Sequence, residues 1–412
     1  MNKGKRIVIL GGGTGGVFAS YELRKLLGKE HQITLIEKNS NYAFPSSFLW
    51  LMIGERKPEE IVSPLTKMLP KGIEPVFGEI RSIDLKNREV EVNSNKISGD
   101  YLIVALGAEL MKEPFGLKNY HTFYTYEGSI KLRDALEKFK GGTVGIVVAS
   151  SPYKCPGAPH EGAMLLDAYF KKRGIREKTE IHLFTPESQP LPAAGQVLGE
   201  AVQKLLEWKG IKFHPLYKPI KFGPGENEIS FEGKGNVKLD LLILIPPHQG
   251  SHIVKVSGLS GQGDWIPVNR QTLETQYENI YAIGDAASVT LPGKWKSDLP
   301  LSLPKAGVFA HTGAKAAARR IAAAVGGETP TETMQGEGYC MLEMGNGIAG
   351  FAYGNFYGEP SPEVNLKTPG KFWHYGKALF EKWWLSPPGL RRFILGEVIE
   401  IGSKMAGIPS AV

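Results

Sequence analysis

Two cysteines, Cys155 and Cys340, are the residues of this 412-residue chain with the clearest potential for chemistry. A chain with only two cysteines cannot form a framework of several disulfides, and no Cys/His spacing of a zinc site is present, so no metal is expected. Cys155 is flanked by Lys154 and followed by His160 and Glu161. A neighbouring cation lowers the pKa of a thiol toward the reactive thiolate, so the sequence predicts a reactive Cys155 rather than a plain buried thiol.

A dinucleotide site is predicted at the start of the chain. Residues 5–10 read as a buried strand, residues 11–16 as a glycine turn and residues 17–27 as a helix, and a second strand over 33–36 ends about 20 residues beyond the glycines. Such a turn lets a pyrophosphate approach the backbone at the positive end of the helix, and an acidic residue binds ribose hydroxyls. The residues expected to hold the dinucleotide are Gly11, Gly13, Thr14, Gly16 and Glu37.

Two later segments indicate which dinucleotide binds. Residues 279–285 form an apolar strand that ends in Gly284-Asp285, and residues 101–107 include Ala105 and Gly107. Both segments resemble motifs of flavoproteins related to the pyridine-nucleotide disulfide oxidoreductases. The resemblance implies FAD as the cofactor, with the aspartate at its ribityl or pyrophosphate part.

The middle of the chain contains a second dinucleotide-type unit without its glycine turn. A strand over 143–149 leads into residues 150–161, whose prolines and side chains obstruct a pyrophosphate, and further strands are predicted over 178–184 and 239–245. The domain shape is therefore expected to persist, while a nicotinamide dinucleotide is disfavoured as the reductant.

The chain resembles the sulfide:quinone oxidoreductases more specifically. That family has a K-C-x-G-A-P element, which matches residues 154–159, and a late Y-C element, which matches residues 339–340. The resemblance implies that Cys155 and Cys340 form a redox-active disulfide that hydrosulfide opens, leaving a persulfide on one cysteine. We expect Cys340 to react with the flavin while Cys155 carries the sulfur chain, although the residues do not decide this division. His160 or Glu161 could move the proton, or could merely cap the loop.

Other positions are expected near the flavin. Lys305, read as the start of a helix over 305–325, would stabilise anionic reduced flavin together with the positive end of that helix. Pro45 stands where relatives cross the flavin ring. Many relatives have a further cysteine near residues 121–127, where this chain has Tyr124-Thr125-Tyr126, so non-covalent FAD is expected.

The end of the chain is rich in aromatic and basic residues. The helix after residues 386–389 repeats apolar residues at three- and four-residue steps, which suits a helix in a lipid headgroup layer or one packed on its own core. We expect a peripheral (monotopic) membrane protein that passes electrons to quinone. These features rest on the apolar Leu390, Phe393, Ile394, Val398, Ile401 and Met405, the basic Lys377, Lys382, Arg391 and Arg392, and the quinone-channel candidates Phe351, Phe356 and Tyr357.

The fold class predicted is α/β, with two Rossmann-like dinucleotide-binding domains and a C-terminal amphipathic helical membrane-attachment region. An FAD domain is expected over 1–110 and 270–330, the second Rossmann-like domain over 111–269, and the C-terminal region over 331–412. The net charge of +7 is modest for this length, so a lipid surface is expected as a partner and no nucleic acid. A homo-oligomer is not excluded.

Export by a leader of its own is not expected from the first residues, which favours the cytoplasmic face of a membrane. The alternatives are a type II NADH:quinone dehydrogenase, a sulfide dehydrogenase with a cytochrome acceptor, and a flavoprotein with an assembly role only.

Overall fold

Five parallel strands form the first sheet of the molecule, seen here in a computed structural model that describes residues 4–117, 120–223, 228–294 and 301–409. The strand order is β20-β9-β1-β2-β5, so a late segment of the chain pairs beside an early one. The strands are short apolar runs because a parallel sheet covered on both faces buries nearly every side chain. Their bounds are β1 (Arg6–Leu10), β2 (Gln32–Glu37), β5 (Ile73–Phe77), β9 (Tyr101–Val104) and β20 (Ile280–Ala282).

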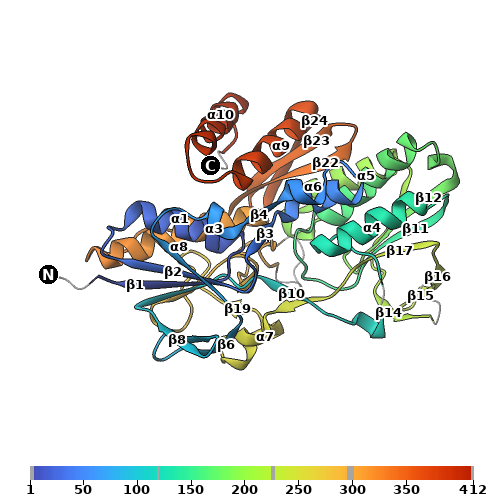
Figure 1. Cartoon of the computed structure of the whole chain (residues 1–412). Helices are drawn as coiled ribbons and strands as arrows, with labels where there is room; N and C mark the ends of the chain where they lie inside the picture. The colour runs from blue at the N-terminus through green and yellow to red at the C-terminus, as the bar shows by residue number, and fades with distance from the viewer. Residues whose placement is uncertain (1–3, 118–119, 224–227, 295–300, 410–412) are drawn as a thin grey trace.

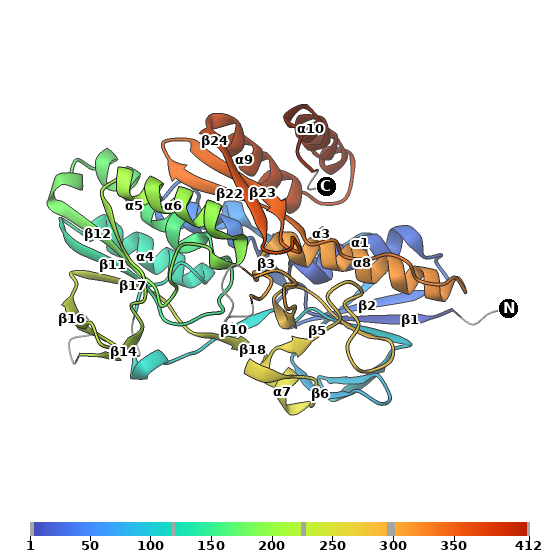
Figure 2. The same cartoon turned by 180° about the vertical axis from the view of Figure 1, so that it is seen from behind.

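Two helices pack together along one face of this sheet, α1 (Thr14–Leu26) and α8 (Gly307–Val325). Figures 1 and 2 show them side by side above β1 and β2. The buried face of α8 contains many alanines, which allow the two helices to approach closely. The helix begins at Gly307, so the expectation that Lys305 forms its start is wrong: Lys305 lies in the loop ahead of it.

A second parallel sheet has the order β13-β12-β11-β17. It comprises β11 (Gly142–Val148), β12 (Thr179–Phe184), β13 (Ile211–His214) and β17 (Leu241–Ile245), with α4 (Tyr126–Lys138), α5 (Ala158–Lys172) and α6 (Gln196–Trp208) around it. The strands predicted over 5–10, 33–36, 143–149, 178–184 and 239–245 lie within two residues of these bounds, whereas β5 and β13 were not predicted. An α/β fold with two parallel sheets is therefore confirmed.

The C-terminal part contains a three-stranded antiparallel sheet as well as the predicted helices. Its elements are β22 (Glu337–Gly345), β23 (Ile348–Asn355), β24 (Glu363–Gly370), α9 (Lys371–Leu385) and α10 (Leu390–Ala406), which lie at the top of the view in Figure 1. The sequence did not indicate this sheet, because glycines in β22 and β23 interrupt the alternation of apolar and polar residues.

Short elements complete the fold. They are β3 (Asn41–Ala43), α2 (Phe48–Met52), β4 (Val62–Pro64), α3 (Leu65–Met68), β6 (Ile80–Asp84), β7 (Glu89–Val92), β8 (Asn95–Ser98), β10 (Ala108–Leu110), β14 (Pro219–Phe222), β15 (Glu228–Phe231), β16 (Gly235–Lys238), β18 (His248–Gly250), α7 (His252–Val256), β19 (Ile266–Pro267) and β21 (Ala287–Ser288). Among the helices of the described ranges, none combines the length and apolar character needed to cross a bilayer.

Candidate active site

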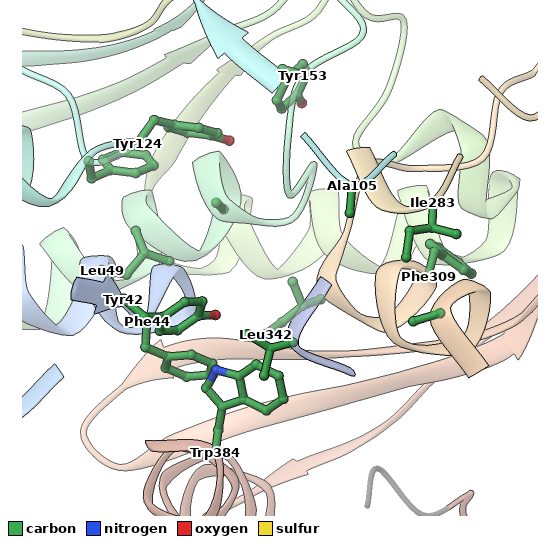
Figure 3. Close-up of a cluster of buried hydrophobic side chains, with 14 of the residues drawn as sticks. Tyr42, Phe44, Leu49, Ala105, Tyr124, Tyr153, Ile283, Phe309, Leu342 and Trp384 are labelled. Atoms are coloured by element: carbon green, nitrogen blue, oxygen red, sulfur yellow. The ribbon is translucent and has the colours of Figure 1, made fainter. Parts of the chain in front are cut away.

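A cavity of about 920 Å³ is lined by residues around the first parallel sheet, by the loop after β11 and the start of α5, and by the C-terminal part. Its walls include the N-terminal glycine turn, the Gly284-Asp285 motif, the Cys155 loop, β22 and α9. Several aromatic side chains of the wall, among them Tyr42, Phe44 and Trp384, gather on one side of it (Figure 3). The volume lies at the upper end of the range for a cofactor site.

The glycine turn leaves the start of α1 open toward this cavity. Gly13 is the N-cap residue of α1, no side chain caps the helix, and a Cβ at Gly13 would touch nothing in the protein. Gly13 and Thr14 line the cavity. A helix N-terminus with exposed backbone amides is suited to a pyrophosphate.

Gly11 and Gly16 shape this turn from behind the cavity wall. Gly11 has φ +105°, a left-handed conformation that favours glycine. A Cβ at Gly16 would overlap the carbonyl oxygen of Gly11. The Glu37 carboxylate accepts hydrogen bonds from the amides of Gly12 (2.7 Å) and Asn39 (3.0 Å) and lines the cavity, so its remaining lone pairs are placed for ribose hydroxyls.

The other predicted flavin residues also reach the cavity. Its lining includes Pro45, Ala105, Gly107, Gly284, Asp285 and Lys305. Burial raises the pKa of Asp285, while Lys154 and Lys305 act to lower it. The two glycines have positive φ, +69° at Gly107 and +65° at Gly284, so each allows a sharp turn at the cavity edge.

The structure brings the two cysteines to the same cavity as free thiols. Cys155 has φ +46°, and its backbone is fixed on both sides: its amide donates to the Lys305 carbonyl (2.6 Å), and its carbonyl accepts from the Tyr124 hydroxyl (3.2 Å). Cys340 lies in β22 and is half-buried. The surface that the Cys155 side chain exposes faces this cavity, so its sulfur is still surrounded by protein atoms.

In this environment the pKa of each thiol is raised, contrary to the expectation of a lowered pKa. Burial, followed by the negative charge of Glu161, raises the pKa of Cys155 to about 12 and that of Cys340 well above its usual range. Cys155 also acts to raise the pKa of Cys340, so the two sulfurs influence each other. Lys377 opposes the rise at both thiols.

Glu161 and Lys377 form a buried ion pair beside the cysteines. The Glu161 Oε2 accepts from the Lys377 Nζ at 2.6 Å and from the Glu343 amide at 3.1 Å. Although burial acts to lower the pKa of Lys377, Glu161 and Glu343 hold it above its usual value. Lys377 is therefore a buried charge of the site, and its expected place in a lipid headgroup layer is wrong.

His160 does not reach the cysteines. It is buried in α5, its Nδ1 lies 3.2 Å from the Pro156 carbonyl oxygen, and it is absent from the residues that line the cavity. Burial lowers its pKa to about 4, so it is neutral near pH 7. Of the two residues proposed to move a proton, only Glu161 lies in the cavity wall.

Three aromatic residues suggested for a quinone channel also lie elsewhere. Phe351 stacks between Tyr339 and Trp373, Phe356 packs on Phe309, and neither these nor Tyr357 lines the cavity. The wall also uses residues to which the sequence assigned no role in the site. They are Tyr124, Lys377, Phe380 and Trp384.

A signal for part of this set was present in the sequence. Lys377, Phe380 and Trp384 follow one another at steps of three and four, which places them on one face of α9.

Arg392 was expected at a lipid surface but is buried, and its guanidinium donates to the carbonyls of Trp383, Trp384 and Ser386. The apolar face of α10, by contrast, is exposed rather than packed on a core. Its side chains and their exposed fractions are Leu390 74%, Phe393 64%, Ile394 50%, Val398 50%, Ile401 55% and Met405 84%.

Comparisons with known proteins agree with this arrangement. The chain is 29% identical over 397 residues to the sulfide-quinone reductase of Aquifex aeolicus, covering 92% of this chain and 90% of that protein. It is 26% identical to the mitochondrial sulfide:quinone oxidoreductase of Mus musculus, with 74% and 69% covered. The solved structure of the Aquifex aeolicus sulfide:quinone oxidoreductase superposes with a TM-score of 0.82 at 27% identity, covering 96% of this chain and 95% of that one.

The glycine turn, the Gly284-Asp285 motif and the start of the helix α8 fall within a single family match. Residues 5–313 match the family model described as pyridine nucleotide-disulphide oxidoreductase. That match spans both parallel sheets and ends within α8. The chain therefore belongs to the pyridine nucleotide-disulphide oxidoreductase family.

Proposed function

We propose that this protein is an FAD-dependent sulfide:quinone oxidoreductase attached to a membrane surface. One observation carries the proposal: Cys155 and Cys340, distant in sequence, line the same cavity as an uncapped glycine-turn helix. The relatives named sulfide-quinone reductase support the choice of substrate and acceptor.

The dinucleotide end of the cavity fits FAD. Gly13 and Thr14 would hold its pyrophosphate, Glu37 its ribose, and Asp285 its ribityl chain. No spare cysteine remains for a covalent link, which favours non-covalent binding. FAD held by these residues would supply two-electron redox chemistry between sulfur and a quinone.

The two cysteines would open and close as a disulfide. Hydrosulfide attacks the Cys155 sulfur, the Cys155–Cys340 bond breaks, and its electron pair leaves on Cys340 as a thiolate. Cys155 is left with a persulfide, whose proton Glu161 is placed to accept because its carboxylate lines the cavity. Lys377 donates a hydrogen bond to the same carboxylate and so holds it in place.

Quinone would enter along the C-terminal helices. Phe380 and Trp384 of α9 line the cavity. The helix α10 packs against α9 and leaves its own apolar face exposed. An exposed apolar helix face with basic residues around it suits the headgroup region of a bilayer. We therefore propose peripheral membrane attachment through α10.

The second sheet has no place for NADH at the usual turn. The Glu187 carboxylate, after β12, accepts from the hydroxyls of Ser151 (3.0 Å) and Tyr153 (3.0 Å), so the loop after β11 is bound to the carboxylate that follows the next strand. In nicotinamide-binding relatives, that region receives the ribose and pyrophosphate. This contact argues against the NADH dehydrogenase alternative.

An anaerobic titration tests the function. Sulfide added to the purified holoprotein should bleach the flavin absorbance, a short-chain quinone should restore it, and NADH should leave it unchanged. Cys155→Ala and Cys340→Ala should keep bound FAD but lose bleaching by sulfide. Rapid bleaching by NADH, with no response to sulfide, would refute the proposal. A cytochrome that restores the oxidised flavin where quinone does not would refute the proposed acceptor.

A further inference from the structure

Three lysines line the cavity that contains the two cysteines, and their ammonium groups differ in what they contact. They are Lys154, Lys305 and Lys377. A cation beside a sulfur site matters because hydrosulfide, thiolate and persulfide are all anions. Which lysine can serve them depends on what each ammonium already contacts.

Lys377 is paired with a carboxylate. Its Nζ lies 2.6 Å from the Glu161 Oε2 and also donates to the Met341 carbonyl at 3.2 Å. Glu161 offsets part of this charge at the thiols, although Lys377 still acts to lower the pKa of both. Lys377 is therefore occupied with Glu161.

Lys305 is held by the main chain and by an aromatic ring. Its Nζ donates to the carbonyls of Asp285 (2.8 Å) and Ala287 (3.2 Å) and lies 3.5 Å from the centre of the Trp265 ring. Burial lowers its pKa to about 8, which weakens its charge further. The Lys305 carbonyl also accepts a hydrogen bond from the Cys155 amide. Lys305 therefore connects the Gly284-Asp285 motif to the Cys155 loop.

Lys154 is the remaining cation. It directly precedes Cys155 and lines the cavity, and within the ranges that the structure describes no hydrogen bond or ion pair reaches its ammonium. Burial lowers the pKa of Lys154, while Asp285 and Cys155 act to raise it. Its charge in turn favours the ionised form of Asp285 and contributes to lowering the pKa of His248. Its backbone forms a β-bridge with Lys305, which fixes the chain from which the side chain extends.

We propose that Lys154 is the anion-recruiting residue of the sulfur site, attracting hydrosulfide to the cysteines and stabilising the sulfur anion that forms on Cys155. The proposal rests on the proposed function for the identity of the anion. A fixed charge in a cavity with low-dielectric walls raises the local concentration of oppositely charged substrate. The loss of Lys154 should therefore raise the KM for sulfide more than it lowers the rate at saturating sulfide.

The test compares an anionic with a neutral thiol reagent. In full-length holoprotein with Cys340→Ser, Cys155 is the only thiol, and its alkylation rates by iodoacetate and iodoacetamide are measured by intact mass. Both reagents need the same thiolate, so the ratio of their rates cancels any change in the pKa of Cys155 and reports the local charge. Lys154→Met should lower the iodoacetate/iodoacetamide ratio about threefold or more.

Two matched variants complete the experiment. Lys154→Arg should keep the ratio, since it keeps the charge, and Lys382→Met should keep it too, since Lys382 is exposed on α9. A ratio in Lys154→Met equal to that in Lys382→Met would overturn the proposal. The ratio does not depend on sulfide turnover, so a protein that fails to oxidise sulfide would refute the proposed function and leave this test of Lys154 intact.

Discussion

Replacing two apolar residues of α10 should detach the protein from a lipid surface. Leu390 and Phe393 have 74% and 64% of their surface exposed. Complete burial of such a side chain contributes about 1.5–3 kcal/mol, so each should contribute about 1–2 kcal/mol at these exposures. Leu390→Ser/Phe393→Ser should therefore weaken partitioning into bilayers by about 2–4 kcal/mol, which is at least about 30-fold. Serine is well tolerated near a helix start, so α10 itself should persist.

The assay is co-sedimentation of the holoprotein with vesicles that contain anionic phospholipid. The matched control is Trp208→Ser, since Trp208 is 78% exposed on α6, away from the C-terminal helices. The double variant should still reduce a short-chain quinone with sulfide while losing activity with a long-chain quinone held in vesicles. Equal weakening by Trp208→Ser, or unchanged binding of the double variant, would refute the assignment of α10 as the attachment surface.

Three further variants test the interior of the site. Burial, followed by the charge of Glu161, raises the pKa of Cys155. Glu161→Gln should therefore lower the pKa of Cys155 and speed its alkylation by iodoacetamide at pH 8 about fivefold or more. An unchanged alkylation rate would contradict this electrostatic account. In Gly16→Ala the new Cβ overlaps a carbonyl oxygen of the same turn, so the purified protein should contain little flavin by absorbance, and full flavin content would argue against this turn as the pyrophosphate site. Arg392→Met removes a buried guanidinium from three carbonyl oxygens and should lower the free energy of unfolding in urea by about 2–4 kcal/mol, whereas the exposed Arg391→Met should change it little.

The parallel sheets and the dinucleotide turn were predictable because their signals are local. An apolar strand followed by glycines and a helix requires only neighbouring residues, and the predicted strands lie within two residues of the observed ones. The presence of Cys155 and Cys340 in one cavity was implied by family resemblance, since nothing in their separation along the chain brings them together.

The electrostatics of the site were not predictable in the same way. The pKa of Cys155 depends on burial and on Glu161, and the effect of Glu161 depends in turn on Lys377, which lies 216 positions later in the chain. His160 shows the converse: it is close to Cys155 in sequence, but α5 turns its side chain away from the cavity. Proximity along the chain therefore overstated the role of His160 and gave no indication of the role of Lys377.

The helix α9 connects the sulfur site, the Pro45 turn and α10, which could otherwise be mistaken for independent parts of the protein. Its Lys377 neutralises Glu161 beside the sulfur site, its Glu381 binds Ser47 and Arg56 next to the Pro45 turn, and α10 packs against it. A truncation before α9, made to obtain a protein that handles well without detergent, would leave Glu161 as an unpaired buried charge, which costs about 3–5 kcal/mol. Such a shortened protein would lose its sulfide chemistry along with α10, the proposed attachment surface, so a truncation intended to isolate the catalytic core should fall after α9, within residues 386–389.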